Sequence, residues 1–274
     1  MSQTMQSSLD IGKLVRTGLV LVFTAIALLP IGATVMLAFR PRFGEGALLT
    51  LDNFVRVFRD TLVLDWLGNS LLVSLFTVVA AVIVAAPAGY VISRGRHRII
   101  AGYSLLLFVV QSLPIITAVI PLFMLFAYLG LADHLGALVI IYVAGSLSVA
   151  TWMMAAYFDS IPATLEEASW IDGCSVFGGF VRIVLRNSLP GVLSTAIFTF
   201  LLSWNDYLVA IVFLKSDTSF TLPIGLQSFF QQTSTDWGAV MAVSVITMLP
   251  PVILFAVLNR FFSVGGIGGS LAGN

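Results

Sequence analysis

Residues 67–93 read LGNSLLVSLFTVVAAVIVAAPAGYVIS, a stretch without a charged side chain. About 20 mostly apolar residues in an α-helix cross the roughly 30 Å of hydrocarbon in a membrane, so this stretch is long enough to span one. A helix is required because lipid offers no hydrogen-bond partners to open backbone groups. The stretch therefore predicts a membrane-spanning helix in an all-α fold.

Five further apolar stretches lie on either side of this one, which predicts a polytopic membrane protein with six transmembrane helices. A signal peptide is the alternative for the first stretch, but its apolar run is longer than a signal core. We expect a short cytoplasmic N-terminal segment, residues 1–16, followed by a single transmembrane domain over residues 17–274. The predicted spans are residues 17–39, 67–93, 103–129, 135–158, 188–214 and 238–261.

The composition agrees with a membrane protein. Apolar residues make up 59% of the 274 and charged residues 9%, whereas soluble domains carry about 25% charged residues. The single cysteine, Cys174, excludes a disulfide framework and a cysteine-based zinc site. The formal net charge of zero leaves no basic footprint for nucleic acid.

Positively charged residues predict the orientation. Arg94, Arg96 and Arg98 lie between the second and third predicted spans without an acidic neighbour. Cytoplasmic loops carry an excess of Lys and Arg, so this loop is expected inside the cell. With an even number of spans, both termini are then cytoplasmic, and residues 40–66 and 215–237 form external loops.

The loop between the fourth and fifth predicted spans, residues 159–187, carries helix signals of its own. Thr164 is placed to cap a helix over residues 165–171, with Glu167 three positions on as the capping-box partner. Gly173 is placed to end that helix in a left-handed turn. A second short helix is predicted over residues 176–184. We therefore expect two short helices on the cytoplasmic surface.

This loop resembles the EAA motif of ATP-binding-cassette (ABC) importer permeases, Glu-Ala-Ala-x3-Gly-x9-Ile-x-Leu-Pro. Two positions depart from the motif, since Ser169 replaces the second Ala and Arg186 replaces the Pro. The matching segments are Glu167-Ala168-Ser169, Gly173 and Ile183-Val184-Leu185.

Further segments are similar to the carbohydrate-uptake branch of these permeases, and their order is like that of the smaller maltose-type permease. The similarity covers roughly residues 67–273, with Ala272 where the branch usually has Lys. The segments are Pro190-Gly191, Trp204-Asn205-Asp206, Thr221-Leu222-Pro223-Ile224-Gly225-Leu226, Trp237-Gly238-Ala239, Leu249-Pro250 and the glycine-rich tail from Gly265.

The resemblance implies an inner-membrane subunit of a binding-protein-dependent sugar importer. Its expected partners are a second homologous permease, two cytoplasmic ATPase subunits that bind ATP and Mg²⁺, an extracytoplasmic solute-binding protein and membrane lipid. No cofactor and no enzymatic activity are expected in this chain, which has no Gly-x4-Gly-Lys-Ser/Thr phosphate loop. The residues expected to couple to the ATPase are Glu166, Glu167, Ala168, Ser169, Asp172, Gly173, Ile183 and Leu185.

Polar residues inside the predicted spans are candidates for lining the translocation path, because such residues are costly in lipid. Asp206 lies toward the outer end of the fifth predicted span, where an interhelical polar clamp is the favoured alternative. The path candidates are Gln111, Asn205, Asp206 and Tyr207.

The external loop over residues 215–237 mixes amides, hydroxyls and aromatic rings, which suit sugar recognition and also suit any interfacial loop. By resemblance it reaches toward the binding protein, through Gln227, Phe229, Phe230 and Gln231. The competing function is an ion-coupled secondary transporter of a small polar solute. That class usually shows repeated halves and acids at the membrane midplane, and neither stands out here.

Overall fold

The computed structural model describes residues 2–41, 49–230 and 235–266. The chain divides into two compact units, residues 1–61 with 228–247 and residues 62–227 with 248–274, which are described separately. The helices are α1 Ser2–Ala38, α2 Asp52–Asp60, α3 Val63–Arg94, α4 Arg98–Ser112, α5 Ile115–Tyr128, α6 Leu135–Asp159, α7 Ala163–Ile171, α8 Val176–Gly179, the π-helical η1 Phe180–Val184, α9 Leu185–Asn187, α10 Leu189–Trp204, α11 Leu208–Phe213, the 3-10 turn η2 Asp217–Ser219, α12 Leu222–Gln227 and α13 Trp237–Gly266.

The prediction of an all-α, polytopic membrane protein is confirmed. Four helical segments in the described part of the chain are long and apolar enough to cross a membrane, and the number rises to six if each of two bent helix pairs counts as one span. The four segments are Gly12–Ala38, Val63–Arg94, Leu135–Asp159 and Trp237–Phe261.

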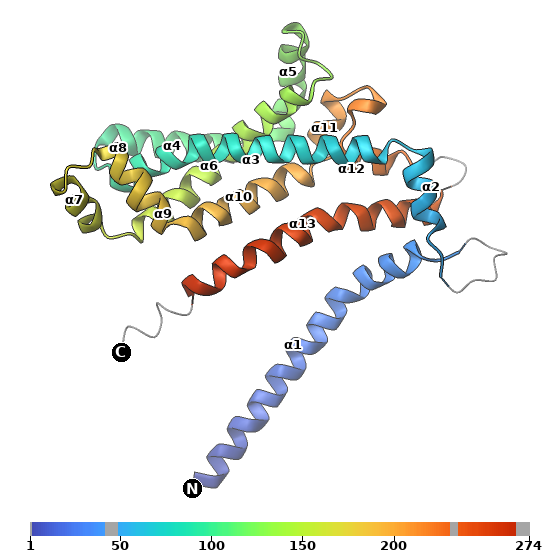
Figure 1. The fold of residues 1–274 in the computed structure, drawn as a ribbon, viewed down its shortest axis with the longest axis horizontal. Helices are drawn as coiled ribbons and strands as arrows, with labels where there is room; N and C mark the ends of the chain where they lie inside the picture. Colours follow the sequence, from blue (N-terminus) through green and yellow to red (C-terminus); the bar gives the residue numbers. More distant parts are fainter. Residues whose placement is uncertain (1, 42–48, 231–234, 267–274) are drawn as a thin grey trace. The chain divides into compact units, whose positions relative to one another are not determined.

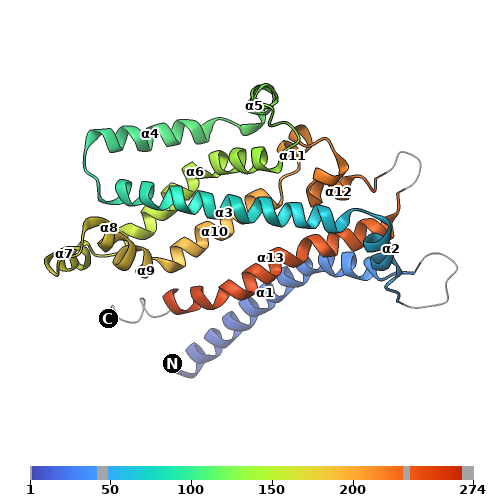
Figure 2. The same ribbon diagram turned by 45° about the horizontal axis from the view of Figure 1, so that its top comes forward.

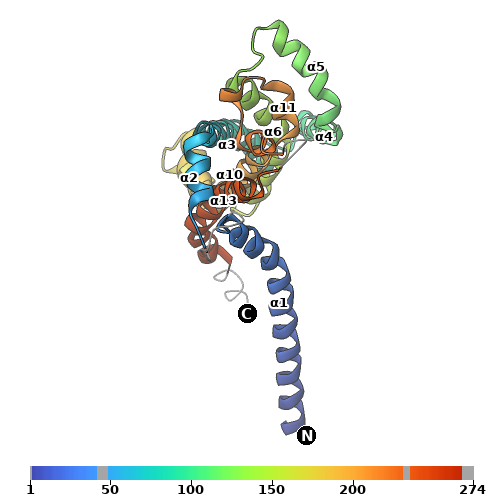
Figure 3. The same cartoon turned by 90° about the vertical axis from the view of Figure 1, so that its right-hand side faces the viewer.

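The third predicted span, residues 103–129, is not continuous. Helices α4 and α5 meet at an angle of 91°. Pro114 forces the residue before it out of the helical region, and Leu113 accordingly has an extended backbone (φ −82°, ψ 122°). In Figure 2, α4 is seen along its length and α5 end-on, whereas Figure 3 shows the reverse.

The fifth predicted span, residues 188–214, also differs from the structure. Helix α10 stops at Trp204, and the segment Asn205–Tyr207 separates it from the short helix α11. Before α10, the helical run Val176–Asn187 meets α10 at an angle of 77°. Pro190 lies in the first turn of α10, a position where its missing N–H costs no helical hydrogen bond.

Helices α3, α6 and α10 pack together as the core of the second unit (Figure 1). Small residues allow close approach of α3 and α6: a Cβ added at Gly89 would lie 2.7 Å from the Cβ of Met154 and 2.9 Å from the carbonyl of Thr151. Association of helices in lipid depends on such close packing. The core cluster near this contact is Ala85, Ala86, Ala150, Met154, Phe158, Phe180 and Val184.

In the first unit, Asn53 holds the end of α1 to α2. Its side-chain amide donates to the carbonyl oxygens of Ala38 (2.8 Å) and Arg40 (3.0 Å). Arg56 donates to the Asn53 side-chain oxygen (2.7 Å) and forms an ion pair with Asp236 (2.9 Å). The buried face of α2 is therefore centred on Asn53 and Val57.

Candidate functional site

The segment over residues 159–187, called the EAA loop below, consists of α7 followed by the continuous helical run α8–η1–α9. The predicted cap at Thr164 is wrong, because Pro162 occupies the N-cap position and no side chain caps the helix. Thr164 therefore lies inside α7 and Glu167 does not close a capping box.

The predicted left-handed turn at Gly173 is confirmed, with φ of 89°. The N–H of Cys174 donates to the carbonyl of Ser169 (2.9 Å), and the N–H of Gly173 donates to the carbonyl of Trp170 (3.0 Å). This pair of bonds defines a Schellman motif, which satisfies carbonyl groups left open at the end of a helix. The turn fixes the direction in which α8 leaves α7.

The two glutamates of α7 differ in burial. Glu166 is 1% exposed and Ser169 is 8% exposed, and Ser169 donates to the Glu166 carbonyl (2.7 Å). Glu167 and Ala168 are exposed, as are Asp172 and Gly173 at the end of the helix. Neighbouring helix positions differ by about 100°, which explains why adjacent residues face different surroundings.

Several apolar side chains of the EAA loop are exposed. The exposed fraction is 87% for Ile171 and 73% for Phe177. Val176, Leu165 and Trp170 are also exposed. Exposed apolar side chains in such number on one loop are typical of a surface that another protein covers.

The end of the motif lies in the second helical run. Ile183 and Leu185 are half-buried, and the Ile183 carbonyl accepts from Asn187 (2.7 Å). Arg186, which replaces the expected Pro, is exposed within α9. The bend that the Pro would be expected to make is still present, at Ser188 directly after α9.

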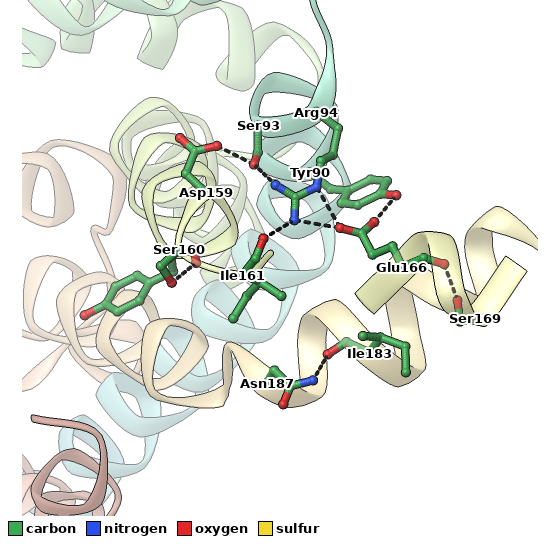
Figure 4. Close-up of polar contacts among 11 residues, drawn as sticks. Tyr90, Ser93, Arg94, Asp159, Ser160, Ile161, Glu166, Ser169, Ile183 and Asn187 are labelled. Carbon is green, nitrogen blue, oxygen red and sulfur yellow. Dashed lines mark hydrogen bonds and ion pairs between the residues drawn. The ribbon is translucent and has the colours of Figure 1, made fainter. Parts of the chain in front are cut away.

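A buried ion pair joins the EAA loop to the end of α3 (Figure 4). The Glu166 carboxylate accepts from Nε of Arg94 (2.7 Å) and lies 2.6 Å from its Nη2. Its second oxygen accepts from the hydroxyl of Tyr90 (2.7 Å). From the sequence alone, Arg94 is a topology signal and not a partner of Glu166. The missed signal was the i, i+4 spacing of Tyr90 and Arg94, which puts both on one face of α3.

Arg94 also holds the turn before α7. Its Nη2 donates to the Ile161 carbonyl (2.9 Å) and its Nη1 donates to the hydroxyl of Ser93 (3.0 Å). Ser93 in turn donates to Asp159 (2.5 Å). The guanidinium thus uses all three of its nitrogens, as Figure 4 shows.

Asp206 lies at the break between α10 and α11. One of its carboxylate oxygens accepts from the Tyr142 hydroxyl (2.7 Å) and from the N–H groups of Val209 (3.0 Å) and Ala210 (3.1 Å). It therefore caps α11 and ties it to α6. Asn205 is exposed and donates to the Leu201 carbonyl (2.9 Å), and Tyr207 is half-buried against the core cluster of α5, α6 and α11.

The remaining path candidate, Gln111, is exposed near the end of α4, next to the bend at Leu113. It lies on a different helix from the group at residues 205–207. Among the described residues, no three His, Cys, Asp or Glu side chains gather as a metal site would require.

The external-loop candidates lie after α12. Gln227 ends this helix and is exposed, Phe229 is half-buried, and the ring of Phe230 meets that of Trp237 edge-on at 6.0 Å. Gln231 lies outside the described residues.

The earlier part of the same loop is held by α3. The indole of Trp66 donates to the Asp217 carbonyl (2.8 Å), and Asn69 donates to the carbonyls of Thr218 (2.8 Å) and Phe220 (2.9 Å). The N–H of Leu222 donates to the hydroxyl of Ser70 (2.7 Å). Each end of α3 therefore carries contacts to a different loop.

Asp133, in the turn between α5 and α6, binds the segment after α11, a contact that the sequence did not indicate. Its carboxylate accepts from the N–H groups of Lys215 (2.8 Å) and Ser216 (3.2 Å) and from the Ser216 hydroxyl. Desolvation acts to raise the pKa of Asp133, but these hydrogen bonds, with a smaller effect of His134, outweigh it and lower the pKa below its ordinary 3.8.

These features define a class of protein. An all-α membrane protein with several apolar helices and an exposed helical loop between two of them has the features of a transport permease. The chain belongs to the family described as "Binding-protein-dependent transport system inner membrane component", which matches residues 78–264.

Several proteins of similar sequence are named as transport permeases. The inner membrane ABC transporter permease protein YcjP of Escherichia coli (strain K12) is 36% identical, over 82% of this chain and 81% of that protein. The maltodextrin transport system permease protein MdxG of Bacillus subtilis (strain 168) is 33% identical, over 82% and 81%. The arabinooligosaccharides transport system permease protein AraQ of Halalkalibacterium halodurans is 32% identical, over 89% and 92%.

Solved structures agree on the fold. A chain of a bacterial ABC transporter involved in the import of the acidic polysaccharide alginate matches with a TM-score of 0.78 at 21% identity, over 92% of this chain and 97% of that chain. A chain of the MetNI methionine ABC transporter matches with a TM-score of 0.60 at 17% identity, over 74% of this chain and 95% of that chain.

Proposed function

We propose that this chain is the permease subunit of an ATP-driven, binding-protein-dependent importer of a sugar or oligosaccharide. It forms half of the translocation path, and a second, homologous permease forms the other half. Two ATPase subunits bind ATP and Mg²⁺ on the cytoplasmic side, where both termini of this chain lie. A solute-binding protein delivers the sugar from outside.

The observation that carries this proposal is the two-sided arrangement of the EAA loop. One side of α7, with Glu166 and Ser169, is buried against the chain itself. Glu167, Ala168 and Ile171 of α7 are exposed, and so is the apolar Phe177 of α8. An apolar surface rimmed by a charge is suited to a groove on another protein, with Glu167 pairing to a basic residue there.

The proposed substrate class rests on the relatives. The names of MdxG and AraQ specify maltodextrin and arabinooligosaccharides, and a further relative from Agrobacterium fabrum, SmoH, is named for sulfoquinovosyl glycerol (30% identical over 82% of this chain). All three solutes carry sugar units. A sugar-containing solute is therefore the substrate class that we propose for this chain.

Co-purification with the cognate ATPase tests the coupling role. We expect Glu167→Lys to insert in the membrane but to recover less than about a tenth of the ATPase, because the reversed charge repels a basic partner and its burial is costly. Asp60→Lys, a charge reversal on the external helix α2, serves as the matched control and is expected to recover ATPase normally. Equal recovery from both variants would contradict the docking assignment.

A thermal-shift screen tests the substrate class. The cognate binding protein is screened against mono-, di- and oligosaccharides, polyols, amino acids and peptides. We expect its melting temperature to rise with a sugar ligand, since binding to the native state raises stability. A response limited to amino acids or peptides would contradict the proposed substrate class.

A further inference from the structure

We infer that Arg94 and Glu166 form an internal clamp that makes the EAA loop move together with α3. Glu166 is then a positioning residue within this chain and does not contact the ATPase. The inference rests on the proposed function, since it specifies how movement of the docked loop reaches the membrane-spanning part.

The burial of Glu166 is the first argument. A carboxylate that is 1% exposed cannot also pair with a residue of another protein unless α7 leaves its position. Removing one partner of a buried ion pair is strongly destabilising, because a charge is then left uncompensated. The exposed neighbour Glu167 remains free of this constraint and is the residue available to a partner.

The geometry of the clamp is the second argument. Arg94 is the last residue of α3 and Glu166 lies in the first turn of α7, so each charge also suits the dipole of its own helix end. The guanidinium grips Glu166 together with the Ile161 carbonyl, which fixes the turn as well as the helix. Such planar, multiply bonded contacts hold geometry more strictly than a single point charge.

Aromatic side chains pack next to the clamp. The ring of Tyr90 lies 4.7 Å from that of Phe180 and 6.5 Å from that of Phe158, while its hydroxyl donates to Glu166. Phe180 begins η1 and Phe158 lies near the end of α6. The polar and apolar contacts therefore connect α3, α6, α7 and η1 as one group.

Helix α3 is a suitable receiver for movement of the loop. It runs for 32 residues, about 48 Å at 1.5 Å per residue, and packs against α6 and α10. At its other end, Trp66 and Asn69 hold the segment Asp217–Phe220. A displacement of α7 that is passed to α3 would therefore reach the opposite loop.

Cysteine labelling tests this chain of contacts without knowledge of the solute. In a Cys174→Ser background, Thr218→Cys places a reporter in the exposed segment that Asn69 holds. The complex with its cognate ATPase is reacted with a maleimide, with and without ATP, Mg²⁺ and vanadate. We expect nucleotide to change the labelling rate at residue 218 by about fivefold.

Glu166→Gln and Arg94→Gln are then expected to abolish this nucleotide response while recovering the ATPase as the parent chain does. The double variant Arg94→Gln/Glu166→Gln leaves no unpaired charge, so it also answers the case in which a single variant does not fold. It is expected to lack the nucleotide response. Its loss of response should be no larger than that of either single variant, since both residues act through one contact.

Three results would overturn the inference. The first is a full nucleotide response in the double variant. The second is a loss of ATPase from the double variant as complete as from Glu167→Lys, which would make Glu166 a docking residue. The third is a parent chain that recovers ATPase but shows no response at residue 218. Failure of the proposed function itself differs from all three, because the parent chain would then recover no ATPase.

Discussion

At the residue scale, the turn at Gly173 depends on backbone conformation and not on space. A Cβ at this position meets no atom within 4 Å, but φ is 89°. A left-handed conformation costs an alanine about 1–2 kcal/mol, whereas asparagine tolerates it better. We therefore expect Gly173→Asn to retain most solute uptake and Gly173→Ala to lose about fivefold or more. Gly173→Val, with a β-branched side chain, should be the most severe. Equal uptake in all three would show that the turn does not position α8.

Asp133 makes a second prediction at this scale, on pH. Because its folded-state pKa is lowered, its contribution to stability is present above the ordinary pKa of 3.8 and is lost as the pH falls through the lower folded-state value. The melting temperature of the purified wild-type protein should therefore exceed that of Asp133→Asn equally at pH 7 and pH 5. The difference should shrink only below about pH 4.

The asparagine variant is a suitable comparison because it keeps an acceptor oxygen, tolerates the left-handed backbone of residue 133 (φ 61°) and does not titrate. A difference that changes between pH 7 and pH 5 would contradict the assignment of these hydrogen bonds to an ionised Asp133.

At the element scale, the break between α10 and α11 is stabilised by Asp206, which accepts three hydrogen bonds. Asn can accept the same bonds, whereas Ala accepts none, and each bond contributes about 1 kcal/mol. We expect Asp206→Ala to lower the melting temperature strongly, Tyr142→Phe to lower it less, and Asp206→Asn to change it little. The KM for uptake should stay unchanged in Asp206→Asn.

The neighbouring residue supplies the control: Asn205→Ala removes a single exposed hydrogen bond and is expected to lower the melting temperature much less than Asp206→Ala. A rise in KM in Asp206→Asn with no change in melting temperature would instead place the acid in contact with the solute.

The sequence predicted the existence of the elements better than their continuity. Hydropathy identified every apolar stretch, because length and apolar character alone decide whether a helix suits lipid. It did not reveal the 91° bend between α4 and α5, or the end of α10 at Trp204. The bend follows Pro114, and the start of α11 after the break is capped by Asp206, which also accepts from Tyr142 of α6.

The candidate site, too, was only partly predictable from the sequence. The position of the EAA loop and the turn at Gly173 followed from local sequence. The different surroundings of Glu166 and Glu167 did not, because they depend on Arg94, which lies 72 residues earlier in the chain. Thr164 was misassigned for a local reason: α7 begins at Ala163, directly after Pro162, so Thr164 already lies inside the helix.

At the scale of the whole molecule, chemical labelling of the single cysteine tests the orientation of the chain in the membrane. Cys174 is partly exposed in the EAA loop, directly after Gly173. If this loop is cytoplasmic, a membrane-impermeant maleimide should label Cys174 in inside-out vesicles and not in intact spheroplasts. In the Cys174→Ser/Thr218→Cys variant the pattern should be reversed. Labelling of residues 174 and 218 from the same side would contradict the proposed topology.

The source of energy is the central claim for the whole molecule. The most direct test is solute uptake into vesicles that contain this chain with its partner permease, ATPase and binding protein. We predict that uptake requires ATP on the ATPase side and persists when ionophores collapse the proton and sodium gradients. Uptake that proceeds without ATP and stops when an ion gradient is collapsed would contradict the account and would favour an ion-coupled secondary transporter.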